Sequence, residues 1–551
     1  MTGSTAPPPD AELALLVDSG SAWTKASLIG RTRGRWRVVG HVAQPAEWSA
    51  PAIERSLAEL LAPTADRRLV DRLAALIAGA TRIECHTPRR SARLAVAAVS
   101  RELSGAAARR AAESAGWEVA VTATADDGRP LAGRLAALQE VEADAWLLAG
   151  GFDDGRSPQA LEVAALVAAA RRPGGGPVIW AGSARLGDEV AALFEPGAVT
   201  VMPNPRPDRT HEASGRLRAH LEELLRATVE PGAALRLAPV ALRRAVGELA
   251  RASGLRVAAV DIGARYATRV EATPDGGASS RVFAAGGLGG IAAAASGPTR
   301  VTRGLGYPIE ELAVADVLQN LRARPATLPH TDDELAVMQG VARAQLAAMA
   351  DEAPLGGVDL LIGAGMALAG APAPAAATQM LLDGLRPLGV TQLAIDASAL
   401  LGPIGALEGG EVAEGIALLA DDLLVPLGTA VVCRGGEPGR VAMRVTIHRP
   451  GWPDAAPVEV RAGQLLLQQL PRGTQAELII ELAEGVSLGA PRRAARYQAH
   501  ASGGVSGLLL DARGVPLGLP RRAEDRRAVL AGWRDSFRRE PVAGTPADRR
   551  S

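Results

Sequence analysis

Short apolar runs that end in polar or glycine-containing turns recur along the chain. The first run, Leu13 to Val17, ends in Asp18-Ser19-Gly20-Ser21 and leads into a second run, Ala26 to Ile29. This pattern predicts a strand, a tight turn and a returning strand. A third strand is expected over Arg35 to Gln44. Helical spacing of the apolar residues between Ala52 and Ala80 then predicts one or two helices.

Further along, apolar strands alternate with helices. A strand over Leu94 to Val99 is expected to lead into a helix from Leu103 to Gly116, and a strand over Ala145 to Ala149 runs into the turn Gly150 to Gly155. Such turns lie at the carboxyl ends of parallel strands, where ligands bind in open α/β sheets. The turn has two open interpretations, a ligand or partner site and a plain tight connection.

A second strand ends in the same way as the first. Leu255 to Val260 is followed by Asp261-Ile262-Gly263, so both strands are followed by Asp-x-Gly. A later strand, Val358 to Ile362, delivers Gly363-Ala364-Gly365. The repeat predicts an internal duplication. Three strands followed by helices begin a ribonuclease-H-like half, so we expect an α/β fold of two such halves.

The first turn carries groups that can hold phosphate. Gly20 allows backbone amides to approach an anion, and Asp18 can hold a hydrated magnesium ion. Hydroxyl donors are supplied by Ser19, Ser21 and Thr24. Lys25 is the single lysine of the chain, where arginine serves elsewhere, and its ammonium can meet a phosphate as a point charge. An ordinary hairpin with a solvated lysine is the alternative.

The pattern changes near Leu424. Short β-rich segments follow, Gly507 to Leu519 is typical of a hairpin, and Arg521 to Arg539 predicts an arginine-rich helix docked through apolar side chains. The predicted organisation is a disordered leader (1–12), an N-terminal lobe with the first phosphate loop (13–253), a second lobe with the second phosphate loop and an adenosine-side turn (254–423), and a C-terminal β-rich domain (424–551).

Composition narrows the function classes. The chain has 551 residues, 48% of them hydrophobic and only 3% aromatic, so surfaces for stacking nucleic-acid bases are scarce. Lys plus Arg and Asp plus Glu are both 60, so no net field attracts DNA or an anionic membrane. Cys85 and Cys433 are far apart, which excludes a disulfide framework. With no signal-like or membrane-spanning segment, a cytoplasmic protein is expected.

The order of the motifs resembles the glutamate mutase L family, companions of the coenzyme-B12-dependent glutamate mutase, within the superfamily of actin, sugar kinases and heat-shock ATPases. The matching segments are VDSGSAWTK (17–25), RLAVAAVSRELSGAAARRAAESAG (93–116), WLLAGGFDDG (146–155), VMPNPRP (201–207), VAAVDIGARYAT (257–268), GLG (304–306), LLIGAGMAL (360–368) and LLDGLRPLGVTQLAIDASALLGPIGAL (381–407). Together they cover most of residues 13–420.

The resemblance implies an ATP- and Mg²⁺-binding, chaperone-like protein that reactivates a cobalamin-dependent mutase, its subunits being the partners. It gives Asp18 and Asp261 the catalytic and metal-binding roles. It assigns the nucleotide to Ser19, Gly20, Ser21, Thr24, Lys25, Gly263, Thr268, Gly363 and Gly365. An ATPase activity is implied but uncertain, and a homodimer stays open. Neither nucleic acid nor membrane is an expected partner.

The sequence departs from the family pattern in the second loop. The family has Asp-Ile/Val-Gly-Gly-Ala-Thr-Thr-Asp, whereas Ala264 to Arg269 here lacks the second glycine and has arginine in place of an acidic residue. Slow or absent hydrolysis is one consequence, and phosphate contact by Arg265 or Arg269 is another. Two rival functions remain. One is a small-molecule kinase with Asp153 or Asp154 as base, and the other is a non-catalytic, non-hydrolysing scaffold in which the second loop no longer binds nucleotide.

Overall fold

The structure is a computed structural model. It describes residues 12–62, 67–88, 90–155, 157–229, 236–283, 287, 290–291, 296–352, 354–355, 357–409, 411–451, 456–489 and 495–538. The expected leader lies outside these residues except for Glu12. The chain divides into a main unit (Met1–Cys85, Arg244–Ala278 and Ala285–Ser551) and an inserted unit (His86–Arg243 and Ser279–Ala284).

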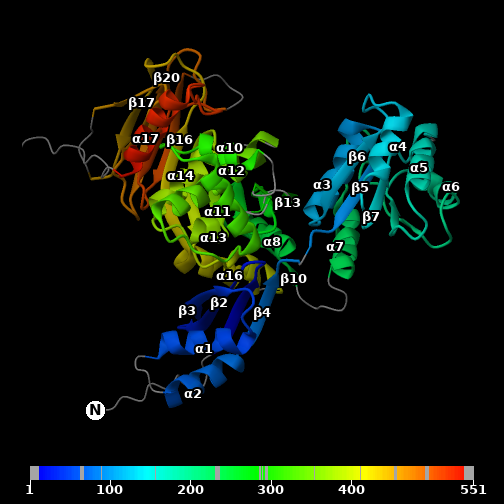
Figure 1. The fold of residues 1–551 in the computed structure, drawn as a ribbon, viewed down its shortest axis with the longest axis horizontal. Coiled ribbons are helices and arrows are strands. Elements are labelled where there is room, and N and C mark those ends of the chain that lie inside the picture. Colours follow the sequence, from blue (N-terminus) through cyan, green and yellow to red (C-terminus); the bar gives the residue numbers. More distant parts are fainter. Residues whose placement is uncertain are drawn as a thin grey trace, which may run out of the picture. The chain divides into compact units, whose positions relative to one another are not determined.

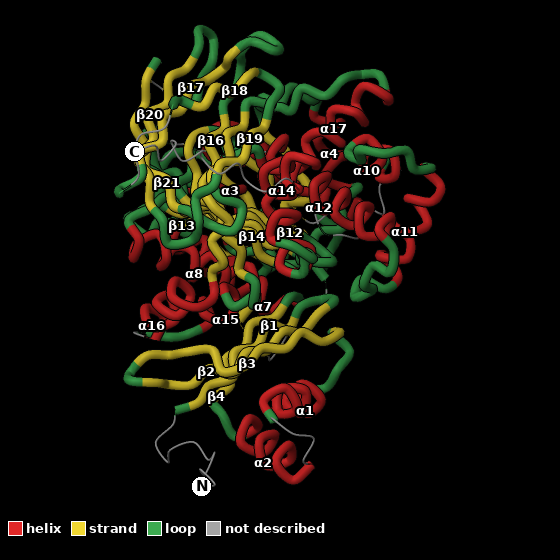
Figure 2. Tube along the Cα trace, turned by 90° about the vertical axis from the view of Figure 1, so that its left-hand side faces the viewer, coloured by secondary structure: helices red, strands yellow, loops and turns green. Residues whose placement is uncertain are grey.

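The first sheet of the main unit begins with the predicted hairpin. Its strands within this unit are β1 (Leu13–Ser19), β2 (Trp23–Thr32), β3 (Arg35–Pro45) and β4 (Thr81–His86), in the order β4-β1-β2-β3. Strand β10 (Arg236–Leu237) belongs to the inserted unit. Helices α1 (Ala50–Leu61) and α2 (Arg67–Ala78) pack side by side on one face (Figures 1 and 2). Alternate residues such as Leu15, Val17 and Leu28 point to that face and meet Leu57, because side chains along a strand alternate.

The second sheet repeats this plan and extends it. Within the main unit its order is β12-β11-β14-β15-β16-β22-β19. The bounds are β11 (Val257–Ile262), β12 (Ala267–Ala272), β14 (Leu360–Ala364), β15 (Gly389–Asp396), β16 (Leu424–Val432), β19 (Leu465–Gln468) and β22 (Leu508–Asp511). Strand β13 (Ala278–Phe283) consists, apart from Ala278, of residues of the inserted unit. The segment β12-β11-β14 has the same strand order as β2-β1-β4, and β1–β2 and β11–β12 are both antiparallel hairpins. The predicted duplication of α/β halves is confirmed.

Helices accompany the second sheet. They are α10 (Gly297–Arg303), α11 (Glu311–Ala323), α12 (Asp332–Glu352), α13 (Met366–Ala369), α14 (Pro374–Leu385), α15 (Leu401–Ala406), α16 (Glu411–Leu418) and a π-helix (Leu419–Leu423). Helices α12 and α14 pack closely, because Gly384 leaves room for Leu346: a Cβ added at Gly384 would lie 2.3 Å from that of Leu346. Helix α8 (Ala238–Ser253) precedes β11.

The C-terminal region is β-rich, as predicted, and shares its strands between two sheets. A separate four-stranded sheet has the order β18-β17-β20-β21, formed by Val458–Arg461, Val441–His448, Gln475–Leu482 and Arg496–Ser502. Strands β16, β22 and β19 belong instead to the eight-stranded sheet. The hairpin predicted over Gly507 to Leu519 is wrong: β22 is fully buried between β16 and β19, and no second strand follows it in the described residues up to Arg538.

A buried ion cluster ties the chain end to the second lobe. Arg513 Nη1 lies 2.7 Å from Asp383 of α14 and Arg513 Nη2 lies 2.8 Å from Asp511 of β22. The guanidinium also lies over the ring of Trp533, on α17 (Ala523–Arg538). The Arg513 side chain has no exposed surface, so its charge is balanced entirely by these neighbours.

The inserted unit is a doubly wound parallel sheet. Its strands are β5 (Arg93–Ala98), β6 (Glu118–Thr124), β7 (Ala145–Ala149), β8 (Val178–Trp180) and β9 (Val199–Val201), in the order β6-β5-β7-β8-β9. Numbered along the unit, this is 2-1-3-4-5, the order of flavodoxin-like sheets. The helices are α3 (Ala106–Ser114), α4 (Leu131–Gln139), α5 (Pro158–Ala170), α6 (Gly187–Ala191) and α7 (Gly215–Val229).

Alternating side chains on these strands make two cores. Leu94, Val96 and Ala98 pack with residues of α3 and α7, whereas Ala95 and Ala97 pack with residues of α4 and α5. Figure 1 shows α3 and α7 on one side of the sheet and α4, α5 and α6 on the other. Both faces of the sheet are therefore covered, which explains its nearly continuous apolar strands.

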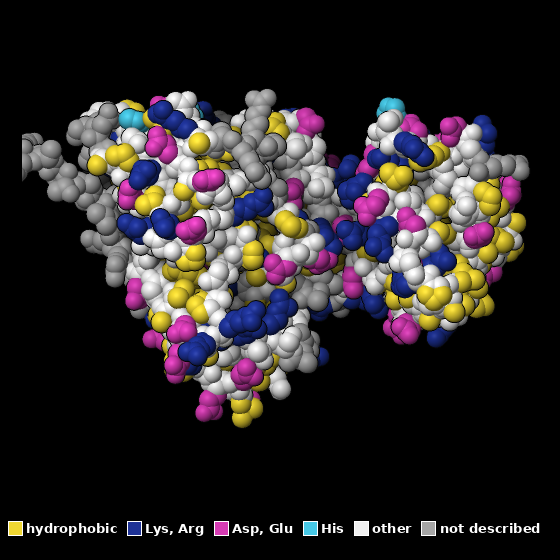
Figure 3. Space-filling model, turned by 90° about the horizontal axis from the view of Figure 1, so that it is seen from above, with side chains coloured by type: hydrophobic (Ala, Val, Ile, Leu, Met, Phe, Trp, Pro, Cys, Tyr) yellow, Lys and Arg dark blue, Asp and Glu magenta, His cyan; other side chains and the backbone are white. Residues whose placement is uncertain are grey.

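The surface carries charges of both signs. In Figure 3, basic and acidic side chains are interspersed over the visible face, in keeping with the equal numbers of the two kinds. Among the described residues, no helix has both the length and the apolar character needed to cross a membrane.

Candidate functional site

The two hairpins have the same local geometry. The Gly20 N–H donates to the Trp23 carbonyl over 3.0 Å, and the Gly263 N–H donates to the Tyr266 carbonyl over 3.1 Å. A Cβ at Gly20 would lie 2.5 Å from the Trp23 oxygen, and one at Gly263 would lie 2.9 Å from the Tyr266 oxygen. Each turn therefore requires glycine at its third position after the apolar run. The duplication seen in the sequence extends to individual hydrogen bonds.

The residues opposite the two aspartates differ. Across the first hairpin Asp18 faces Lys25, and across the second Asp261 faces Thr268. Lys25 Nζ donates to Asp18 Oδ2 over 2.7 Å, and the two side chains are only 9% and 13% exposed. The single lysine is therefore not a solvated surface residue: it is held in place beneath the first turn.

Three carboxylates share this one ammonium. Burial alone would lower the pKa of Lys25, but attraction by Asp18 and Asp261 raises it. Burial raises the pKa of Asp261 to about 6, with attraction by Lys25 opposing and repulsion by Asp18 and Asp396 adding to the rise. Burial also raises the pKa of Asp396 to about 6. With three carboxylates and one ammonium, the site has an excess of negative charge, which a bound cation could neutralise.

Gly365 brings backbone against this cluster. It follows β14 with φ of +83°, and a Cβ at this position would lie 2.4 Å from Asp261 Oδ1 and 2.5 Å from the Ile262 carbonyl oxygen. Gly363 serves helix packing instead, since a Cβ there would lie 3.1 Å from Leu368 and 3.2 Å from Leu381. Of the two glycines predicted for the adenosine-side turn, Gly365 therefore lies at the aspartates and Gly363 lies in the core.

Some predicted residues point away from the cluster. Ser19 follows Asp18 in the strand and so points to the other face, where its hydroxyl donates to Glu84 over 2.5 Å. Thr24 is opposite Ser19 and shares its face. Ser21 lies in the turn itself. The structure therefore brings Asp18, Lys25 and Asp261 together but does not bring the Ser19 and Thr24 hydroxyls to them.

The arginine of the second loop is outside the cluster as well. Arg269 faces Val260 across the hairpin, one residue away from Asp261, and its guanidinium lies 3.0 Å from Glu271 on the same face. Thr268 is the residue that faces Asp261. The arginine therefore adds no positive charge beside Asp261. Arg265 lies exposed in the turn.

Asp396 and Cys85 join the site without having been assigned to it from the sequence. Asp396 ends β15 just as Asp18 and Asp261 lie at the ends of their strands, a signal that a search for every strand-ending aspartate would have found. Its carboxylate accepts the N–H groups of Leu400 (3.1 Å) and Leu401 (2.9 Å) at the start of α15. Cys85 Sγ lies 3.7 Å from Asp18 Oδ1, and burial raises the pKa of this thiol well above its usual value.

The donor set suits a hydrated magnesium ion better than a fully protein-bound metal. Among the described residues, no group of three or more His, Cys, Asp or Glu side chains is arranged to hold a metal directly. Magnesium usually keeps several waters and uses one or two carboxylates together with substrate phosphates. Asp18 and Asp261 fit that role, because their excess negative charge remains to be neutralised.

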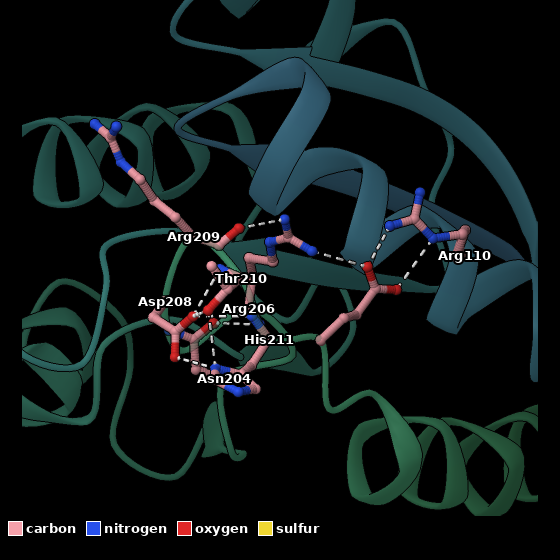
Figure 4. Close-up of polar contacts among 8 residues, drawn as sticks. Arg110, Asn204, Arg206, Asp208, Arg209, Thr210 and His211 are labelled. Carbon is pink, nitrogen blue, oxygen red and sulfur yellow. Dashed lines mark hydrogen bonds and ion pairs between the residues drawn. The ribbon is translucent and has the colours of Figure 1, made fainter.

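The inserted unit links two other sequence motifs by polar contacts. The Asn204 side chain donates to the Gly151 carbonyl over 2.8 Å and to Asp153 over 3.1 Å, so it fixes the turn after β7. Figure 4 shows the loop that follows, in which Asp208 accepts from Thr210 and His211. These contacts stabilise turns, and they favour a structural role for the motif at 201–207.

Neighbouring charges hold the same loop against α3. Arg206 and Arg110 both pair with Glu212, at 3.4 Å and 2.5 Å (Figure 4). Since Arg110 is on α3 and Glu212 lies in the loop before α7, the Arg110 pair joins α3 to this loop, and the Arg206 pair lies within the loop.

The comparisons with known proteins place the chain in a family. Among solved structures it is similar to nucleotide-free acetone carboxylase, with 11% identity, a TM-score of 0.30, and coverage of 82% of this chain and 81% of that chain. It is also similar to component A of (R)-2-hydroxyglutaryl-CoA dehydratase from Acidaminococcus fermentans, with 9% identity, a TM-score of 0.24, and coverage of 74% of this chain and 96% of that chain. A third similar structure is the ROK hexokinase from Thermus thermophilus, with 12% identity, a TM-score of 0.22, and coverage of 71% of this chain and 97% of that chain. Scores this low support no conclusion about function.

No curated protein matches the sequence. The family model described as MutL protein matches residues 14–423. The matched segment contains both hairpins and the whole aspartate cluster. The resemblance drawn from the motifs is therefore confirmed, and the chain belongs to the MutL protein family.

Proposed function

We propose that the chain binds ATP with magnesium at the Asp18–Asp261 site and acts as a chaperone-like accessory protein of a coenzyme-B12-dependent mutase. The observation that carries the nucleotide part is the charge balance: one buried and two partly buried carboxylates share one ammonium, beside two glycine turns with the same hydrogen bond. A hydrated divalent cation would neutralise the charge of the carboxylates. The ATP phosphates bound to that cation would be anionic partners for the Lys25 ammonium.

Each hairpin has a distinct task in this proposal. The Lys25 ammonium, which donates to Asp18, would also contact phosphate oxygens as a point charge. The glycine turns at Gly20 and Gly263 would let backbone N–H groups approach the same phosphate oxygens. Gly365 keeps the space beside Asp261 free of a side chain. Bound magnesium would supply charge neutralisation at the phosphates.

Asp261 keeps the catalytic and metal-binding roles that the family resemblance implies. Its pKa of about 6 is that of the metal-free site, and bound magnesium would hold the carboxylate ionised. Ser19 and Thr24 stay predicted nucleotide ligands and would require a different hairpin register or side-chain rotation to reach the phosphate. A phosphate-release assay measures the rate of ATP hydrolysis.

The accessory role follows from membership of the family. The glutamate mutase L resemblance implies mutase subunits as partners, and nucleotide binding would then favour one of two lobe arrangements that the mutase senses. A cytoplasmic location and the possibility of a homodimer stay predictions from the sequence. The rival kinase function needs Asp153 or Asp154 as base, but Asp153 already accepts a hydrogen bond from Asn204.

Calorimetry with Mg-ATP tests the proposal. We expect micromolar binding by the wild type, weakened at least about tenfold by Lys25→Ala because a charge-assisted contact is lost, and largely retained by Lys25→Arg. No binding at millimolar Mg-ATP would contradict the proposal and leave the scaffold alternative. Phosphorylation of a sugar without any protein partner would favour the kinase instead.

A further inference from the structure

The inserted unit contains a cavity of about 610 Å³ that the ATP proposal does not use. Basic and hydroxyl side chains dominate its lining. The lining residues are Arg101, Glu102, Gly105, Ala106, Arg109, Thr122, Thr124, Asp127 and Arg129. A volume of this size is in the usual range of small-molecule sites.

Two elements of the unit form opposite walls. One wall is the start of the helical segment after β5, a π-helix (Arg101–Gly105) that continues as α3. The other is β6, on which Thr122 and Thr124 point to the same face because they are two residues apart. Gly105 allows the walls to approach, since a Cβ there would lie 3.2 Å from Thr124 Cγ2 and 2.8 Å from the Ser100 carbonyl oxygen.

The cavity lies at the carboxyl ends of two neighbouring parallel strands. It is lined by residues that follow β5 and by residues at the end of β6, one strand interval away from the point between β5 and β7 at which the order of this sheet reverses. The π-helix is a second indication, because such rare turns are frequent at functional sites. The position and the turn type thus favour a binding site over a simple packing defect.

The guanidinium groups of the lining are only partly neutralised. Arg129 is committed to Asp127, with contacts of 2.6 and 3.0 Å, and to the Thr122 carbonyl. Arg101 donates from Nη2 to the Asp127 carbonyl over 3.2 Å and forms no ion pair with any described residue. Arg109 pairs with Glu113 at 3.5 Å. Of the three lining arginines, Arg101 is therefore the one whose guanidinium has no carboxylate partner among the described residues, although its backbone N–H donates to Asp126.

We propose that the inserted unit binds a small phosphate ester in this cavity, with the phosphate held between Arg101 and Arg109. Guanidinium groups bind phosphate oxygens in paired hydrogen bonds, and the Thr122 and Thr124 hydroxyls can add to them. The cavity is larger than a phosphate ion, so the remainder of the ligand occupies the rest of it. This site belongs to the inserted unit and does not depend on ATP at the hairpins.

Calorimetry on the full chain, without magnesium and with a chelator present, tests this site. The probes are inorganic phosphate, pyrophosphate and AMP. The proteins are the wild type, the double variant Arg101→Gln/Arg109→Gln, and the control Arg172→Gln/Arg226→Gln. The control removes the same charge from exposed positions of the same unit outside the cavity lining. All four arginines are exposed, so both variants should fold.

We expect saturable binding of at least one probe by the wild type and the control, and binding at least about tenfold weaker by Arg101→Gln/Arg109→Gln. Tighter binding of AMP than of phosphate would assign a nucleotide, and equal binding would assign the phosphate group alone. Equal affinity in all three proteins, or no binding at millimolar concentration, would overturn the proposal. Neither result would bear on Mg-ATP binding, which is measured separately with Lys25→Ala.

Discussion

Lys25 and Thr268 occupy the same position in two copies of one hairpin, each directly across from a strand-ending aspartate. In the first copy the pair is Asp18 with a cation, and in the second it is Asp261 with a neutral hydroxyl. The duplicated site is therefore electrically asymmetric. The Lys25 ammonium is shared by Asp18 of the first half and by Asp261 and Asp396 of the second half. The magnesium ion of a bound Mg-ATP would add the positive charge that this cluster lacks.

Removing the lysine should destabilise the protein strongly. Lys25→Met leaves Asp18 buried without its partner, and breaking a buried ion pair in this way lowers the free energy of unfolding by about 3–5 kcal/mol. Arg72→Met removes a positive charge from the exposed surface of α2 and should change it by less than about 0.5 kcal/mol. Urea unfolding at pH 8 compares them, and equal effects would show that the ammonium is not needed by the cluster.

Neutralising Asp261 should have the opposite effect. Its pKa of about 6 in the folded protein lies above its ordinary 3.8, so the folded state holds this proton more tightly than the unfolded state. Stability from this group is full below pH 4 and is lost as the pH rises toward 6. Asp261→Asn should therefore raise the free energy of unfolding by about 1–3 kcal/mol at pH 8, while weakening Mg-ATP binding.

The pH dependence distinguishes this effect from general stabilisation. The difference between Asp261→Asn and the wild type should grow between pH 4 and 6 and be constant above about pH 7. A difference that is independent of pH, or a variant less stable than the wild type at pH 8, would mean that Asp261 is not repelled by its neighbours.

Gly365 tests the geometry beside the aspartate. Gly365→Ala forces a left-handed backbone on alanine and places its Cβ against Asp261 Oδ1, so both stability and nucleotide binding should fall. Gly254→Ala is the matched control, because Gly254 also has positive φ but has open space around it, and it should lose only about 1–2 kcal/mol of stability. Thermal unfolding and calorimetry measure the two effects. Normal Mg-ATP affinity in Gly365→Ala would remove this glycine from the site.

Asp383 tests the attachment of the chain end. Asp383→Ala leaves the fully buried guanidinium of Arg513 with one carboxylate fewer and should lower the free energy of unfolding by about 3–5 kcal/mol. Asp351→Ala breaks an ion pair with Arg386 in which the acid is 65% exposed, and should cost less than about 1 kcal/mol. Limited proteolysis should cut the first variant near α17. Equal resistance of both variants would show that the cluster does not anchor this helix.

The sequence predicted local elements and the duplication well, because both are encoded in short-range patterns. The strand over Ala145 to Ala149 is found with the same bounds, and the two Asp-x-Gly turns match down to their hydrogen bonds. The direction in which side chains near the turns point was harder to predict from the sequence. The pleat sends Ser19 and Arg269 away from the aspartates, and a shift of one residue decides this.

Long-range pairing was beyond the sequence patterns. Asp396 joins the cluster only because β15 lies two strands from β11 in the same sheet. The run Leu508–Asp511 is equally apolar in a hairpin or in the middle of a sheet, so its pairing with β16 and β19 could not be read from periodicity. The alternation of strands and helices in this part of the chain was predicted, within an N-terminal lobe of residues 13–253, whereas its existence as a separate unit and its strand order required the structure.

The single lysine is a spectroscopic probe of the proposed contact between the Lys25 ammonium and the phosphates of ATP. Protein labelled with ¹³C and ¹⁵N only in lysine gives one Lys25 side-chain signal, to be followed as Mg-ATP is added. The account predicts a saturable shift of this signal by Mg-ATP, absent with magnesium alone or adenosine alone, since the ammonium meets phosphate only in the complex. A signal that stays unchanged while calorimetry reports ATP binding would place the nucleotide elsewhere and contradict the account.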